Sequence, residues 1–271
     1  MFLRIILWLS LTLPLLVGGP ATAQVLTPTK LSTTVSPATA KVGDEVELIV
    51  NARIDPTWHL YATDFDPDLG PTVFTFTWTN NTAAFDGDLS QYGAVLFLNT
   101  PGEELNPAQR GKFEAYMRAG GNAMVVHRAA ITPPDAWPWY EKLVGRRFVN
   151  HPMVQTGVVD TVDSGFPATF GLPERWIWSD EFYVTTNPYE VRIDTVLGVD
   201  ESSYDPTLIW PGQTVKGMGK DHPIAWRHRH ENGRVFVTTL GHNGEMYRDP
   251  QYLGHLLGGI YWAATGRGQR R

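Results

Sequence analysis

The 271-residue chain contains no cysteine. That absence excludes disulfides, a thiolate nucleophile and a metal site with cysteine ligands. Basic residues are also few, with 22 Lys and Arg against 28 Asp and Glu, for a formal net charge of −6. They are scattered and form no stripe that could neutralise phosphates, so we expect no nucleic-acid partner. Hydrophobic residues make up 42% of the chain, enough for the core of one large or two small globular domains.

Long apolar runs are likewise lacking. Residues 1–23 combine a basic start at Arg4, an apolar run from Ile5 to Val17 and small residues up to Ala23, which is typical of a secretory signal peptide. The run is shorter than the roughly 20 residues that span a membrane, although an uncleaved anchor is the alternative. We expect cleavage after Ala23, a periplasmic or secreted protein, and no stable membrane insertion after cleavage.

The segment that follows predicts a linker and then a small β unit. Residues 24–37 are rich in Thr, Ser and Pro, as linkers are. Within 38–80, polar and apolar residues alternate over Val42–Ile54 and Val73–Trp78, which predicts antiparallel strands with one solvated face. Through Lys41–Val46 and Ile54–Tyr61, this unit resembles the first half of the amino-terminal immunoglobulin-like domain of the thiol-disulfide interchange protein DsbD. The resemblance covers about residues 31–79 and lacks redox cysteines, so it implies a partial β domain without redox activity.

From residue 90 to residue 266, strands and helices alternate. Ala94–Leu98 and Ala123–Val126 are unbroken apolar runs, typical of parallel strands covered on both faces. Between them, Asn106 followed by Pro107 and Gln109 predicts the capped start of a helix, and strand, helix and strand in this order predict a right-handed crossover.

The rest of this region adds a hairpin and a last helix. Ile224–His228 and Val235–Leu240 flank an Asn-Gly pair, a strong hairpin signal. An apolar stripe between Asp249 and Gly266 predicts a long amphipathic helix. We expect residues 267–271 to be a disordered tail.

Polar side chains follow the predicted strands. His127 and Arg128 follow one buried strand, Asn99 follows the other, and His242 comes after the second strand of the hairpin. Open parallel sheets bind ligands beyond the carboxyl ends of their strands, and imidazole acts as an acid, base or metal ligand near neutral pH. We therefore expect His127 and His242 to meet in one hollow, the alternative being that a histidine only caps its strand.

Asp180 and Glu181 are the candidate acidic partners. If their segment is extended, their side chains point to opposite faces and only one enters the pocket, and we favour Glu181. Surface placement of both is the alternative.

Further histidines and aromatic residues are secondary candidates. His222 lies in a loop and is expected either to contact the ligand or to fix the loop. Trp137 and Tyr183 are expected either to stack on sugar rings or to fill the core. The other histidines are assigned structural roles: exposed surface for His228 and His230, loop structure for His151, and local packing for His255.

The ordered motifs of this region resemble the ThuA-like trehalose-utilisation family. They cover about residues 90–266 and include Phe97–Thr100, Trp137–Gly145, Asp221–Trp226, Leu240–His242 and His255–Ala263. The family is similar in fold to class I glutamine amidotransferases, which implies an α/β, flavodoxin-like three-layer sandwich. Here the sandwich lacks its usual first β-α-β unit and follows the partial antiparallel β segment. The resemblance implies a role in sugar or disaccharide utilisation. His127 lies in the region where amidotransferases carry their catalytic cysteine, so glutaminase activity is excluded.

Three functional hypotheses follow. The first is an exported enzyme, a hydrolase or isomerase, that acts on a small-molecule carbohydrate with His127 as acid/base and a carboxylate from Asp180 or Glu181 assisting. The second is a carbohydrate-binding or accessory protein without turnover. The third is a metal site formed by His127, His242 and a carboxylate, but no local spacing such as His-Glu-x-x-His supports it. The sequence therefore predicts no metal ligands and identifies no cofactor.

Overall fold

The computed structural model describes residues 29–36, 45–54, 76–100, 102–133, 135–186 and 191–268. The predicted signal peptide, the loop between the first two predicted strands and the last three residues of the expected tail lie outside this part of the chain. In the described residues, no helix is both long and apolar enough to cross a membrane.

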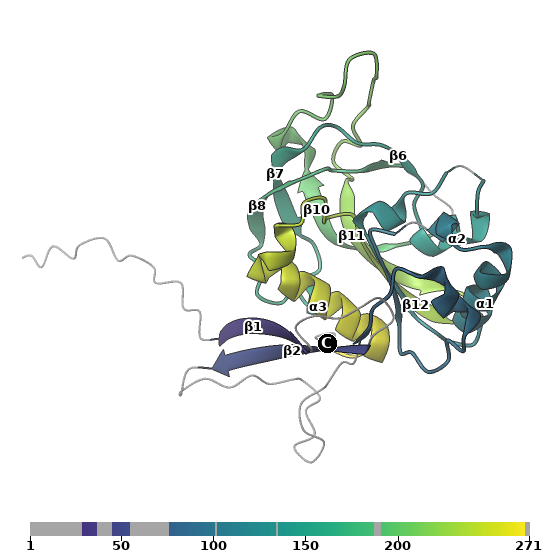
Figure 1. Ribbon diagram of the computed structural model, residues 1–271. Coiled ribbons are helices and arrows are strands. Elements are labelled where there is room, and N and C mark those ends of the chain that lie inside the picture. The colour runs from purple at the N-terminus through teal and green to yellow at the C-terminus, as the bar shows by residue number, and fades with distance from the viewer. Residues whose placement is uncertain are drawn as a thin grey trace, which may run out of the picture.

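A seven-stranded mixed sheet forms the middle layer, in the order β4-β5-β12-β11-β10-β7-β8 (Figure 1). Its strands are β4 (Val95–Leu98), β5 (Ala123–Val126), β7 (Gln155–Thr161), β8 (Arg175–Asp180), β10 (Asp194–Asp200), β11 (Pro223–His230) and β12 (Gly233–Thr238). The first three in sheet order are parallel, and the remaining pairs are antiparallel. The carboxyl ends of β4, β5 and β12 therefore share one edge of the sheet.

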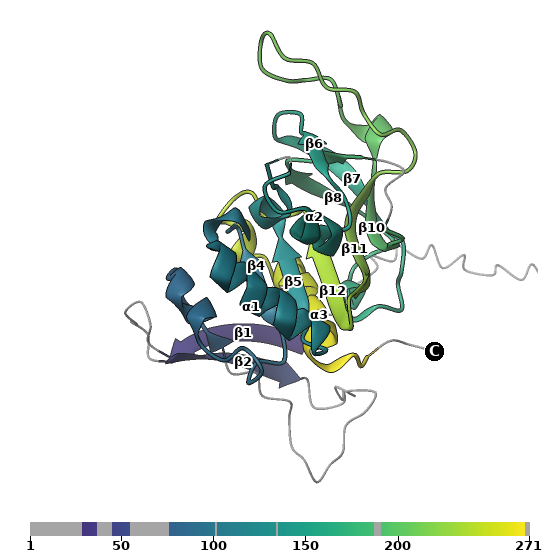
Figure 2. The same cartoon turned by 90° about the vertical axis from the view of Figure 1, so that its right-hand side faces the viewer.

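Helices cover both faces of the sheet. Helices α1 (Pro107–Arg118) and α2 (Pro138–Val144) lie over one face, and α3 (Pro250–Thr265) lies over the other (Figure 2). Strand β5 separates two cores, because Ala123 and Val125 pack with the α1 and α2 side while Met124 and Val126 pack with the α3 side. This alternation across a fully buried strand confirms the expected three-layer sandwich.

Local signals place the ends of the helices as expected. Asn106 accepts hydrogen bonds from the first turn of α1, and the Gln109 side chain reciprocates, which completes the capping box. Asp249 caps α3 at its start, and Gly266 ends it in the left-handed conformation, φ +70°. The predicted hairpin also forms, but its two loop residues are Glu231 and Asn232, one position earlier than the Asn-Gly pair.

Shorter elements complete the described fold. The strands are β1 (Thr29–Ser36), β2 (Glu45–Ile54), β3 (Phe76–Thr77), β6 (Phe148–Asn150) and β9 (Val184–Thr185). β1, β2 and β3 form one antiparallel sheet, and β6 pairs with β9 in a two-stranded ribbon. The 3-10 helices are η1 (Thr82–Asp86), η2 (Gly102–Glu104), η3 (His127–Ala130), η4 (Pro167–Thr169), η5 (Glu201–Ser203) and η6 (Met246–Arg248).

Two expectations about the strands were wrong. Residues 29–36, expected to be linker, form β1, because Thr33, Thr34 and Val35 are β-branched and favour extended backbone. β4 was expected to be covered on both faces, yet Leu96 and Leu98 are 37% and 40% exposed. β4 is the outer strand, and no described strand pairs with its free edge, as expected for a sandwich without its first β-α-β unit.

Candidate functional site

The candidate site lies where β5 and β12 end side by side. Val126 pairs with Thr238 in the parallel ladder, so the chain leaves both strands at the same edge. His127 starts η3 with φ +50°, a conformation unusual for a residue with a side chain. This turn directs a buried imidazole toward the loop after β12, which carries His242.

The tautomer of His127 follows from its partners. Its Nδ1 lies 2.7 Å from the carbonyl oxygen of Thr239, which can only accept, so Nδ1 carries the proton. Its Nε2 therefore offers a lone pair, which the hydroxyl of Tyr183 approaches at 3.1 Å. Burial lowers the pKa of His127, and this effect outweighs the bond to Thr239 and the charge of Glu181. The imidazole is thus kept neutral, with Nε2 as an electron-pair donor.

Glu181 stands among three imidazoles. Its Oε2 lies 3.6 Å from Nε2 of His127 and 3.7 Å from Nε2 of His151, and its Oε1 lies 3.1 Å from Nδ1 of His242. The Glu181 side chain is 12% exposed and that of His242 is 38% exposed. We call His127, His151, Glu181 and His242 the histidine–carboxylate cluster. It opens to solvent on the His242 side.

Asp180 lies beneath this cluster and is fully buried. Its carboxylate accepts hydrogen bonds from the backbone N–H groups of Glu181, Gly241 and His242 and from the indole of Trp178. Burial raises the pKa of Asp180, while these four donors act in the opposite direction. Asp180 thus positions the loop that carries His242 and has no surface that a ligand could touch.

Two residues expected at the ligand surface have internal roles. His222 is 2% exposed, with Nε2 3.0 Å from the backbone carbonyl of Tyr183 and Nδ1 2.9 Å from Glu201, so the loop-fixing alternative fits it. Trp137 is 5% exposed in the core on the α1 side and stacks on Tyr140, so its ring is not available to a sugar. For each residue, the structural one of its two expected roles fits the observed contacts.

The remaining predicted residues lie at or near the cluster. Tyr183 is buried, with its hydroxyl on His127. Asn99, after β4, is exposed, and its amide nitrogen donates to the Tyr247 hydroxyl at 3.0 Å. The backbone N–H of Arg128 donates to the side chain of Asn99, so the ends of β4 and β5 are joined.

Sequence reasoning missed His151, Tyr247 and Trp210. His151 was expected to be loop structure, but the pairing of β6 with β9 carries it to Glu181. Tyr247 donates its hydroxyl to the carbonyl of Gly241. Trp210 is 40% exposed and lies edge-to-face with His151, with ring centroids 5.4 Å apart. No local motif marks these residues, because their positions depend on contacts between distant segments.

The other histidines lie outside the cluster. His228, expected on the surface, is 7% exposed and lies against Gly145 at the end of α2, and burial lowers its pKa to about 4. His230 is half-buried against Trp139. The expected packing role of His255 is confirmed, because it is buried between Ala168 and Thr238.

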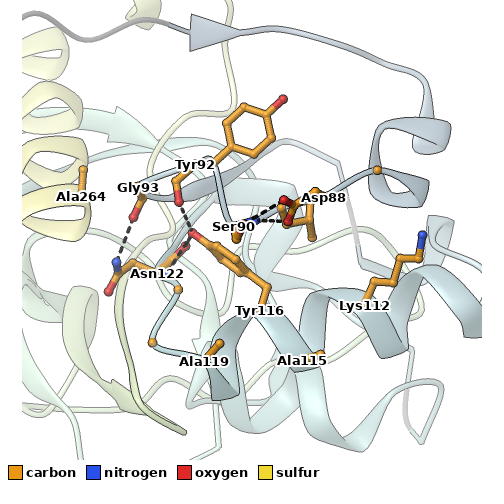
Figure 3. A pocket seen from close by; sticks show the side chains of 14 residues that line it. Asp88, Ser90, Tyr92, Gly93, Lys112, Ala115, Tyr116, Ala119, Asn122 and Ala264 are labelled. Carbon is orange, nitrogen blue, oxygen red and sulfur yellow. Dashed lines mark hydrogen bonds between the residues drawn. The ribbon is translucent and has the colours of Figure 1, made fainter.

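A hollow of about 520 Å³ lies at the other edge of the sheet (Figure 3). It is lined by the end of α1, by residues 87–90, 92 and 93, and by Asn122, which precedes β5. Polar groups of this hollow already form hydrogen bonds within the protein. The hydroxyl of Tyr116 donates to the backbone carbonyl of Tyr92, and the side-chain amide of Asn122 donates to the backbone carbonyl of Gly93. Because its polar groups already have partners, this hollow is a weaker candidate than the histidine–carboxylate cluster.

Comparison with known proteins identifies the family. The profile of the ThuA family, described as trehalose utilisation, matches residues 61–263. The chain belongs to the ThuA family. The match begins at residue 61, upstream of the expected start at 90, and so includes part of the segment that was expected to form a separate β unit. A role related to trehalose utilisation follows at the level of the family.

Solved structures support this assignment. A ThuA-like protein from Bacteroides uniformis has a TM-score of 0.57 and 26% identity, covering 68% of this chain and 75% of its own. A ThuA-like protein from Parabacteroides merdae has a TM-score of 0.55 and 22% identity, covering 71% and 77%. No match was found among the curated proteins.

Proposed function

We propose that this ThuA-family protein binds a sugar or disaccharide of the trehalose type at the histidine–carboxylate cluster and acts on it there. The observation that carries the proposal is the placement of Glu181 among three imidazoles, open to solvent beside His242. A sugar presents many hydroxyl groups, and the cluster presents lone pairs on His127, Glu181 and His242 that can accept hydrogen bonds from them.

The chemistry that fits the cluster is proton transfer. The neutral imidazole of His127 can accept a proton from a bound hydroxyl group, and Glu181 stabilises the imidazolium that results. Ordinary glycoside hydrolysis needs two free carboxyl groups about 5 to 10 Å apart. Asp180 is fully buried and hydrogen-bonded, so the cluster supplies only one. This favours isomerisation over ordinary two-carboxylate hydrolysis.

Trp210 supports a carbohydrate as the ligand. Its ring is 40% exposed and adjoins His151, which in turn contacts Glu181. A flat apolar face beside hydrogen-bonding groups suits a pyranose ring, whose C–H groups and hydroxyl groups lie on different sides. Trp210 therefore offers a stacking surface that Trp137, buried in the core, does not offer.

We also propose that the protein is exported. The support is the signal-like pattern of residues 1–23, with cleavage after Ala23. Amino-terminal sequencing of the protein recovered from the periplasm or the medium tests this. A mature chain that starts at Gln24 is the expected result, and an intact amino terminus retained in the cytoplasm contradicts it.

The functional test is a panel of disaccharides with purified protein. We expect turnover that falls at least about 100-fold in His127→Ala and Glu181→Gln. Glu245→Gln, at an exposed position outside the cluster, is the matched control and should retain wild-type activity. Binding without turnover, unchanged by His127→Ala, would instead support the second hypothesis, a carbohydrate-binding protein without catalysis.

A further inference from the structure

We infer that the histidine–carboxylate cluster is also a binding site for a divalent transition-metal cation of the zinc type, with His127, Glu181 and His242 as ligands. The inference rests on the site of the proposed function and adds a second ligand class for that site. It was the least supported hypothesis at the level of sequence, because its three ligands come from segments far apart in the chain. The fold brings one candidate ligand atom from each residue within 4.8 Å of the other two.

The first argument is the orientation of the lone pairs. Nδ1 of His127 is held by the Thr239 carbonyl, and Nδ1 of His151 lies 2.8 Å from the Pro152 carbonyl. With these contacts, Nε2 of His127 and Nε2 of His151 both lie near the same oxygen of Glu181, at 3.6 and 3.7 Å. The Tyr183 hydroxyl occupies the lone pair on Nε2 of His127, at 3.1 Å, and a cation would replace it there. A histidine whose other nitrogen donates to a backbone carbonyl is also the usual arrangement of a metal ligand.

The second argument is spacing. Zinc binds nitrogen at about 2.0–2.1 Å and carboxylate oxygen at about 2.0–2.2 Å, so two of its ligands lie about 3.4 Å apart in a tetrahedral site. The nitrogens of His127 and His242 lie 3.6 and 3.1 Å from the nearest oxygens of Glu181. His242 is partly exposed, so a small rotation of its side chain can complete the geometry.

The third argument is composition. Many catalytic zinc sites have two histidines and one carboxylate as ligands and keep the fourth coordination position open to solvent. Here the open position faces the side on which His242 meets solvent, where a sugar hydroxyl or carbonyl oxygen can coordinate. With a cation bound, His127 is a ligand, and its role as proton acceptor belongs to the cation-free cluster.

The test is calorimetric titration of the EDTA-treated, desalted full-length protein with zinc chloride, and with cobalt chloride followed by visible absorption. We expect one cation per chain and binding at least about 100-fold weaker in His127→Ala, His242→Ala and Glu181→Gln. Glu245→Gln controls for non-specific binding. Tyr183→Phe should bind zinc at least as tightly as wild type, because it only frees the lone pair of His127.

The outcomes distinguish this inference from the proposed function. Wild-type protein that binds zinc no more tightly than Glu181→Gln overturns the cation site, whether or not disaccharides still bind. Tight zinc binding that depends on the three ligands, with no disaccharide bound in its presence, supports the cation site and contradicts the proposed function. Circular dichroism of each variant confirms that lost binding is not lost folding.

Discussion

His255 provides the most direct test of the packing described above. It lies on α3, 2% exposed, with Nδ1 2.8 Å from the Ala168 carbonyl and Nε2 3.0 Å from the Thr238 hydroxyl. Burial lowers the pKa of His255 from 6.5 to about 4, and the bond to Ala168 only partly opposes this. The folded protein therefore holds this ring neutral over a pH range in which the unfolded chain protonates it.

The sign and size of the effect follow from linkage. Between about pH 6.5 and about pH 4 the unfolded state binds the extra proton, so the free energy of unfolding falls as the pH falls. A pKa lowered from 6.5 to about 4 corresponds to about 3 kcal/mol in total, of which about 2 kcal/mol is lost between about pH 7 and about pH 4.5. The pKa of His228 is also lowered to about 4, so the wild type loses a comparable further amount.

The assay is urea denaturation of wild type and His255→Gln at both pH values. At about pH 7 the variant should be less stable by about 1–2 kcal/mol, because one hydrogen bond is lost. On acidification it should lose about 2 kcal/mol less than wild type, because Gln does not titrate. Gln251→Ala, at an exposed position of the same helix, should keep the wild-type pH dependence. Equal losses in wild type and His255→Gln would refute the reasoning.

Two further changes test the loop after β12. Gly241→Ala should destabilise the protein by at least about 2 kcal/mol in urea denaturation, because Gly241 has φ +131° and an added Cβ would lie 2.5 Å from the hydroxyl of Tyr252. Gly244→Ala, where a Cβ meets nothing within 4 Å, should be neutral, and equal effects would contradict the steric argument. Asp180→Ala should cost about 2–4 kcal/mol in the same assay, because the N–H groups of Gly241 and His242 lose their acceptor, and an unchanged stability would contradict this role.

The helices and buried strands could be predicted because their signals are local. The capping box at Asn106 and the apolar run Ala123–Val126 each depend on a few consecutive residues. What could not be predicted is which strand lies at the edge. The run that forms β4 has the apolar pattern of a buried strand, and only the sheet order shows that Leu96 and Leu98 remain partly exposed.

The candidate site was partly predictable for the same reason. The carboxyl ends of neighbouring parallel strands meet at one edge, which is sufficient to place His127 near His242. His151 could not be found in this way, because a ribbon of only three and two residues carries it to Glu181. His228 was misplaced because α2 covers it. The sequence pattern does not predict that α2 packs on β11, where the Trp226 indole donates to the Val144 carbonyl.

The different positions of Asp180 and Glu181 explain how a site with one free carboxylate is built. Asp180 is the last residue of β8, and strand alternation turns its side chain inward, where four N–H donors compensate its burial. Glu181 then follows outside the strand and points to the imidazoles. The inner carboxylate holds the backbone of the loop that presents His242, and the outer one lies among the three imidazoles. Exchanging the two roles would require moving β8 by one residue in its pairing with β7, which would turn every core side chain of the strand outward.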